Sequence, residues 1–431
     1  MTSLPRYERN LPALLEDLYL GPLPSYRNDL LAAVGRTRQR PAWSFPERWL
    51  PVDIANRLTF APRYPVRVVA VALLVLALII AGVVAYVGTH QPLKPAQPFG
   101  PARNGSLVFA LEGDIYAGDS TSGTSHRIIS GAEFDRKPLL SPDGMQVAFL
   151  RTSADSTTDA FDLMVANVDG SNVRMISTTK VGSADLGLWS PDGTYLLLTD
   201  GDGELVRYDT AAPAPAVVAR HTLIHDFQPP RGGQLLFEST EGDRSLGLMN
   251  PDGSNAHYIY TIPAGETQDG CDFGTVLWSP DGARIAFMRH PVGTPYQCRV
   301  FVMNAHGTGA HQLTNNSGEW FETDFRWSPD SKQIAFDRWQ GPNWRINPIG
   351  VVSADGGQAR SLGPTPVADG AAFEWSPDGK SIISTPGTVT GWPPSTTLPE
   401  AHPTIIDVAT GESHEAPWTM SSWPTWQRVG E

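Results

Sequence analysis

A short phrase recurs along most of this chain: an apolar residue, Ser-Pro, usually Asp-Gly, and then a run of β-branched residues. Five clear copies and one worn copy lie 38 to 51 residues apart, and they begin at Leu140, Trp189, Phe227, Trp278, Trp327 and Trp375. A period of about 40 to 50 residues is typical of propeller blades. Within the phrase, Pro presets φ for a turn and Gly takes the position with positive φ. The repeat therefore predicts an all-β ring of four-stranded blades.

The number of blades follows from the two ends of the repeat region. Residues 107–117 look like the middle strands of a blade that lacks its first strand. Residues 424–427 look like a first strand without the rest, and Trp426 lies in step with the period. We expect the C-terminal strand to complete the first blade, because closure removes exposed strand edges. This gives a seven-bladed propeller. Six blades, with one degenerate repeat extruded as a loop, is the alternative.

The repeat resembles that of TolB-type β-propellers. The resemblance rests on Trp-Ser-Pro-Asp-Gly, on the following Ile-Ala-Phe, and on Val-Met-Asn-Ala-x-Gly at residues 302–307, and it covers roughly residues 102–428. It implies the propeller fold. The chain departs from TolB in three expected features: seven repeats instead of six, no second globular domain before the propeller, and a membrane anchor in place of a cleaved signal. We therefore do not expect the role of TolB itself to transfer.

Charge and hydropathy divide the chain into segments. Val68 to Val87 are twenty uncharged and nearly all aliphatic residues, which as a helix would span roughly 30 Å, the thickness of a hydrocarbon core. Arginines precede this run, so the positive-inside rule predicts a cytoplasmic N-terminus and an extracytoplasmic propeller in a single-pass cell-membrane protein. A buried soluble helix is the alternative. The predicted segments are a tail with short helices and an Arg- and Trp-rich juxtamembrane part (1–66), a transmembrane helix (67–88), a linker (89–101) and the propeller (102–431).

The charge of the propeller excludes one class of partner, and its cysteines suggest a crosslink. After residue 67 the chain has 22 Lys and Arg against 39 Asp and Glu, a balance that repels nucleic acid. Cys271 and Cys298 are the two cysteines of the chain, and both fall in one repeat. We predict that they form a disulfide, which should stabilise the fold by about 3–4 kcal/mol. Two thiols without a zinc-motif spacing argue against a zinc site, and we predict no metal and no cofactor.

The longest connections between the predicted strands should share one face of the ring, because alternate turns of an antiparallel meander point the same way. Binding residues usually lie on such variable loops. Aromatic side chains with an interleaved arginine would suit sugars or peptides, and these candidate ligand-binding residues are Tyr296, Trp320, Phe321, Trp339, Trp344, Arg345 and Trp392. The alternative is that these aromatic residues only cap the hydrophobic ends of the blades.

The sequence contains few signs of catalysis. It has no nucleophile elbow or P-loop and no dinucleotide-binding glycine pattern, so we predict no catalytic residues and a binding, scaffold or sensor module for a protein, peptide or glycan of the cell envelope. The alternative enzyme is a metal-dependent polysaccharide lyase, as some propellers of related repeat are, which would need a convergence of His221, His225, His290 and His402. The layout of tail, span and outer domain also resembles that of anti-sigma regulators, in which the tail docks a cytoplasmic protein.

Overall fold

A computed structural model describes residues 66–89, 95–153, 160–177, 181–182, 187–199, 204–211, 214–230, 232–239, 243–263, 266, 271–291, 297–315, 320–322, 324–340, 345–346, 349–362, 373–385 and 402–430. The chain divides into two compact units, residues 1–91 and residues 92–431. The predicted cytoplasmic tail, up to residue 65, lies outside the described residues.

The described part of the first unit is one helix, α4, which runs Val66–Thr89. Aliphatic side chains between Val71 and Ile80 are about half or more exposed. Among the described residues there is no helix that is both long enough and apolar enough to cross a membrane. The membrane span predicted from the sequence therefore stays a prediction.

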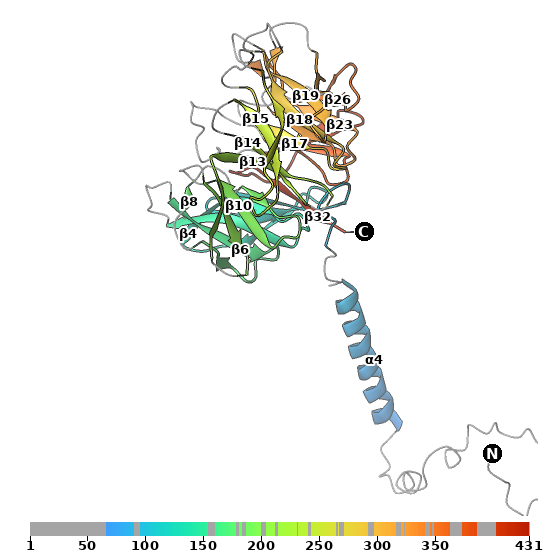
Figure 1. Cartoon of the computed structure of the whole chain (residues 1–431). Coiled ribbons are helices and arrows are strands. Elements are labelled where there is room, and N and C mark those ends of the chain that lie inside the picture. Colours follow the sequence, from blue (N-terminus) through green and yellow to red (C-terminus); the bar gives the residue numbers. More distant parts are fainter. Residues whose placement is uncertain are drawn as a thin grey trace, which may run out of the picture. The chain divides into compact units, whose positions relative to one another are not determined.

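The second unit is an all-β propeller of seven blades, each built on an antiparallel sheet of four strands. Figure 1 shows the strands as arrows, coloured along the chain. Blade 1 has β1 (Arg103–Leu111), β2 (Asp114–Gly118), β3 (Ser125–Ile129) and β32 (Thr425–Val429). Blade 2 has β4 (Glu133–Leu140), β5 (Gln146–Ser153), β6 (Ala160–Asn167) and β7 (Arg174–Met175), and β8 (Val181–Gly182) also pairs with β6. Blade 3 has β9 (Leu188–Trp189), β10 (Tyr195–Thr199), β11 (Glu204–Asp209) and β12 (Ala216–Arg220).

The remaining blades follow in chain order. Blade 4 has β13 (Thr222–Phe227), β14 (Leu235–Ser239), β15 (Ser245–Met249) and β16 (His257–Thr261). Blade 5 has β17 (Val276–Trp278), β18 (Arg284–Arg289), β19 (Arg299–Asn304) and β20 (His311–Gln312). Blade 6 has β22 (Phe325–Trp327), β23 (Gln333–Phe336), β26 (Ile349–Ser353) and β27 (Arg360–Leu362). Blade 7 has β28 (Phe373–Trp375), β29 (Ser381–Ser384), β30 (Thr404–Asp407) and β31 (Ser413–Glu415).

The ring closes within blade 1, as predicted. The last strand, β32, pairs antiparallel with β1, and Leu107 lies opposite Trp426. In Figure 1 the C-terminus lies beside β32. The end of the predicted linker also joins this seam: Pro95 forms a bridge with Val429, and the Arg428 guanidinium donates to the carbonyl of Gly100. The seven-bladed prediction is confirmed, and the six-bladed alternative is wrong.

The recurring phrase forms the tight turn after the first strand of a blade. In blade 5 the Ser279 hydroxyl donates to Asp281 Oδ1 (2.6 Å), and the same oxygen accepts from the amide of Ala283 (3.0 Å). Gly282 has a φ of +72°, and a Cβ there would lie 2.6 Å from the carbonyl oxygen of Pro229 in the preceding blade. Asp281 therefore satisfies the turn, and Gly282 takes the positive φ that the sequence predicts and permits close contact between blades.

The repeated Trp packs one blade against the next. Trp327 is 7% exposed, and its Nε1 donates to the carbonyl of Leu277 on β17 (3.2 Å). Its core cluster combines side chains of blades 5 and 6, so the hydrophobic core lies between neighbouring sheets. Trp278 follows the worn blade 4, and its Nε1 has no hydrogen-bond partner among the described residues. Asp226 of blade 4 instead accepts from the backbone amide of Trp278 (3.0 Å).

Candidate functional site

The connections around blades 5 and 6 bring together a disulfide, a buried histidine and two buried carboxyl groups. Cys271 lies in the connection from β16 to β17, and Cys298 lies just before β19. Their sulfur atoms are joined as a disulfide, with Cα atoms 5.8 Å apart. The two cysteines predicted to pair thus lie at disulfide distance, and they join two connections on the same face of blade 5.

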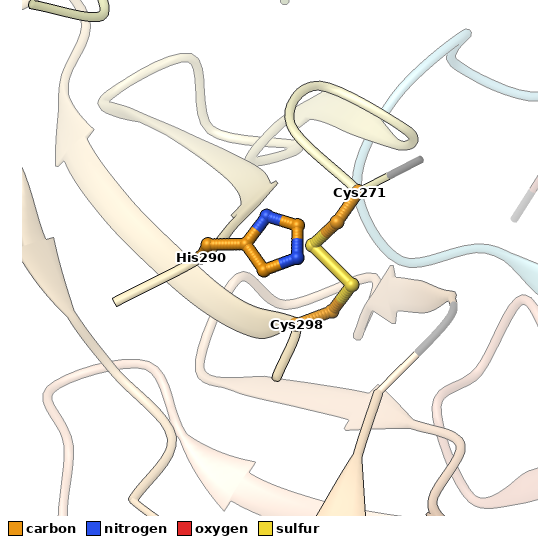
Figure 2. Close-up of side chains that lie close together, drawn as sticks. All are labelled: Cys271, His290 and Cys298. Carbon is orange, nitrogen blue, oxygen red and sulfur yellow. A yellow bond between two sulfur atoms is a disulfide. The ribbon is translucent and has the colours of Figure 1, made fainter. Parts of the chain in front are cut away.

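A buried histidine lies against this disulfide (Figure 2). His290 directly follows β18 and is 5% exposed. Its backbone amide donates to Asp272 Oδ1 (3.1 Å), and its ring Nδ1 lies 3.4 Å from the same carboxylate oxygen. Asp272 is itself 1% exposed. Asp272 therefore holds the backbone of His290, whereas the ring Nδ1 faces this carboxylate without a hydrogen bond to any described residue.

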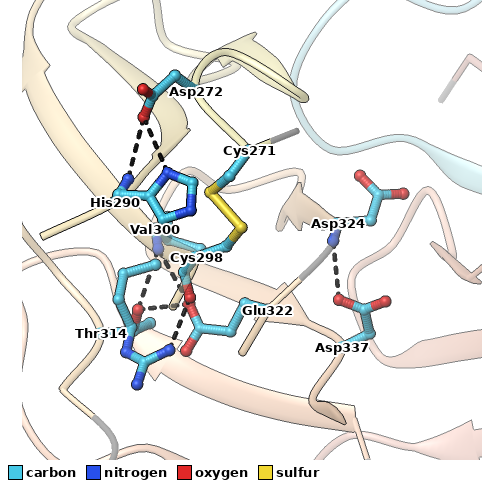
Figure 3. Close-up of a disulfide and its surroundings, with 10 residues drawn as sticks. Cys271, Asp272, His290, Cys298, Val300, Thr314, Glu322, Asp324 and Asp337 are labelled. Atoms are coloured by element: carbon cyan, nitrogen blue, oxygen red, sulfur yellow. Dashed lines mark hydrogen bonds and ion pairs between the residues drawn. A yellow bond between two sulfur atoms is a disulfide. The ribbon is translucent and has the colours of Figure 1, made fainter. Parts of the chain in front are cut away.

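A fully buried carboxylate lies beneath the disulfide (Figure 3). Glu322 is inaccessible to solvent, and its Oε2 accepts from the Thr314 hydroxyl (2.6 Å) and from the amide of Val300 (2.9 Å). Burial raises the pKa of Glu322 to about 7, and these hydrogen bonds and two nearby arginines oppose that rise. The Glu322 amide also donates to the carbonyl of Cys298 (3.2 Å).

Glu322 directly follows a small sheet that stands outside the seven blades. This sheet has the order β21 (Trp320–Phe321), β24 (Trp339–Gln340) and β25 (Arg345–Ile346). Phe321 lies opposite Trp339 in the backbone register, and Gln340 lies opposite Arg345. We call it the aromatic sheet. Because Glu322 bonds to β19 and its backbone bonds to Cys298, the aromatic sheet is anchored to the disulfide side of blade 5.

The structure thus brings four of the residues predicted to bind ligand onto one small sheet, and the other three lie outside the described residues. Trp320, Phe321, Trp339 and Arg345 lie on the three strands of the aromatic sheet. Tyr296, Trp344 and Trp392 lie outside the described residues. Sequence reasoning missed Asp272 and Glu322, which carry no periodic signal. Only the neighbouring Trp320-Phe321 pair marked the position of Glu322.

The four histidines proposed for a lyase-like centre do not converge. His225 Nε2 lies 3.5 Å from Glu238 in blade 4, whereas His402 Nδ1 lies 2.9 Å from the carbonyl oxygen of Ala416 near blade 7. Across the described part of the chain, the one group of three potential metal ligands is Cys271, His290 and Cys298. His221, His225 and His402 belong to no such group. The residues present therefore do not fit a centre built from these four histidines.

Comparison with known proteins gives short or partial sequence matches. No family model matches the chain. An uncharacterized peptidase of Bacillus subtilis, YuxL, is 34% identical over 113 residues, which are 25% of this chain and 16% of that protein. An uncharacterized protein of Agrobacterium fabrum, Atu1656, is 25% identical over 181 residues, 41% of this chain and 47% of that protein. The chain thus spans less than half the length of either relative.

Solved structures match over most of the propeller. An oligogalacturonate lyase in complex with manganese has a TM-score of 0.52 at 12% identity, covering 75% of this chain and 85% of its own. A prolyl endopeptidase has a TM-score of 0.52 at 14% identity, covering 77% and 51%. TolB from Acinetobacter baumannii has a TM-score of 0.43 at 14% identity, covering 80% and 70%. At such identities these likenesses concern the fold. The two matches with a TM-score of 0.52 support a β-propeller and no particular function.

Proposed function

We propose that this protein is a binding module, and that its propeller takes a protein, peptide or glycan of the cell envelope on the loop face of blades 5 and 6. The observation that carries the proposal is the aromatic sheet, which gathers Trp320, Phe321, Trp339 and Arg345 outside the seven blades. Large aromatic residues and arginine are enriched among hot spots, the few residues that contribute most of the binding free energy of an interface. A disulfide and a buried carboxylate brace this sheet, and a rigid surface loses less entropy on binding.

The test begins with a glycan and peptide array probed with the full chain. We expect Trp339→Ala to weaken binding of the best array ligand at least tenfold, since truncating a central aromatic residue commonly costs 2 kcal/mol or more. Isothermal titration calorimetry measures the change. Trp423→Ala is the matched control, because Trp423 is 54% exposed and lies outside the aromatic sheet. Equal affinity of the Trp339 variant and the native chain would place the ligand elsewhere.

We also propose that α4 tethers the propeller to the cell membrane, with the N-terminal tail in the cytoplasm. The exposed aliphatic side chains between Val71 and Ile80 support this proposal, because such a surface is costly in water. We expect the full chain to stay with membranes in alkaline carbonate and to be released by detergent. A variant with Leu74→Glu and Ile79→Arg should shift to the soluble fraction, since charges at the centre of a span disfavour insertion. Release of the native chain by carbonate alone would refute the tether.

A further inference from the structure

Two sulfur atoms and one imidazole nitrogen lie close together on the loop face of blade 5. One donor atom from each of Cys271, His290 and Cys298 lies within 4.8 Å of the others (Figure 2). Cys271 and His290 are buried, and Cys298 is half-buried. The three residues come from the segment before β17, the end of β18 and the start of β19, which are adjacent strands of one sheet. Cys271 precedes β17, and the segment after it pairs with β18: the Phe273 amide donates to the carbonyl of Met288 (2.9 Å), and the Met288 amide donates to that of Thr275 (3.0 Å).

The histidine of this cluster is oriented as metal-binding histidines usually are. Its Nδ1 faces the buried carboxylate of Asp272 at 3.4 Å, and its other ring edge is turned toward the sulfurs (Figure 3). A carboxylate on the far nitrogen of a ligating imidazole fixes the ring and raises its basicity. Asp272 also accepts from the His290 amide, so the oxygen that holds the backbone is the one that the ring faces.

We propose that this crosslink is reversible, and that its reduced form is a zinc site with Cys271, His290 and Cys298 as ligands. A dithiol reductant supplies two electrons and two protons, becomes a disulfide itself and leaves two protein thiols. Zn²⁺ then displaces the two thiol protons and binds both thiolates and the imidazole, with one position open to water. Thiolate and imidazole ligands favour zinc. The spacing of the two cysteines in the sequence argued against zinc, because His290 comes near them only in the folded protein. This proposal does not rest on the proposed binding function.

The chemistry of the sulfurs supports a reversible bond. A histidine beside a cysteine stabilises its thiolate, which makes that sulfur a better leaving group when a thiol attacks the disulfide. The half-buried Cys298 offers such a thiol a route of access. The tether of Glu322 to the carbonyl of Cys298 holds the backbone in place when the bond opens.

The test uses the full chain in detergent, reduced anaerobically with a phosphine that is then removed. We expect Co²⁺ titration to give a thiolate-to-cobalt charge-transfer band that saturates at one ion per chain, and Zn²⁺ to displace the cobalt stoichiometrically. The disulfide form should give no band. Absence of the band from the reduced chain, or an equal band from the oxidised chain, would overturn the proposal.

Variants separate this site from adventitious binding by two thiols. We expect Asp272→Asn to lower zinc affinity by about 10- to 100-fold, measured by competition with a chromophoric chelator, and His290→Ala to lower it further. His306→Ala is the control, because His306 is exposed in the β19–β20 turn of the same blade, and it should leave the affinity unchanged. If His290→Ala fails to fold, Asp272→Asn decides alone. Unchanged affinity in every folded variant would refute the ligand set.

Discussion

Deletion of residues 422–431 should leave the propeller unable to fold cooperatively at physiological temperature. The deletion removes β32 and with it Trp426, whose side chain is 5% exposed and packs with Phe109 of β1 and residues of blade 7. Loss of a buried Trp alone costs about 3–5 kcal/mol, and the loss of a whole strand adds its backbone hydrogen bonds. The total is comparable with the entire stability of a typical domain, about 5–15 kcal/mol. Circular dichroism during thermal melting measures the effect.

The control for this truncation is removal of Glu431 alone, which leaves β32 complete. That chain should melt like the native protein. Were the ten-residue deletion to melt at the native temperature as well, ring closure by the C-terminal strand would have no energetic role.

Substitution of Trp327 by Ala should lower the free energy of unfolding by about 3–5 kcal/mol. The indole is buried between blades 5 and 6, and its Nε1 donates to the carbonyl of Leu277. Its removal leaves a cavity in the shared core and an acceptor without its partner, and the rigid sheets on both sides limit collapse around the gap. Equilibrium unfolding in urea measures the change in free energy from the shift of the midpoint.

The matched control is Trp423→Ala, which removes an indole that is 54% exposed. Surface substitutions usually change stability by less than about 0.5 kcal/mol. Similar losses for both variants would show that the repeated Trp does not hold the blades together.

The periodic features of this protein could be predicted from its sequence, because each blade repeats one set of local requirements. The turn favours Pro and Gly, and the buried strand after it favours β-branched residues. The five clear copies of the phrase therefore predicted five blades. Even the worn copy at Phe227 was placed correctly, although Asp226 there makes a bond to Trp278 that no pattern indicated.

The site was predictable only in part, because most of its residues do not belong to the repeated pattern. The disulfide could be inferred because both cysteines fall in one repeat. The aromatic sheet could not, because its strands have two residues each, and β21 comes from another connection than β24 and β25. Likewise, Glu322 and Asp272 gain their roles only from neighbours distant in sequence. Expectations about the tail, and about Tyr296, Trp344 and Trp392, stay predictions.

The bridge between Pro95 and Val429 has a mechanical consequence. The first and last segments of the ring are fastened to each other, and the remaining blades are continuous in sequence. A pulling force applied to residues before Pro95 would therefore act on the paired strands β1 and β32 of blade 1 before it acts on any other blade. Under a pulling force, β32 would separate from β1 before another blade unfolds. A circular permutant whose termini lie in another blade would move the first site of unfolding to that blade.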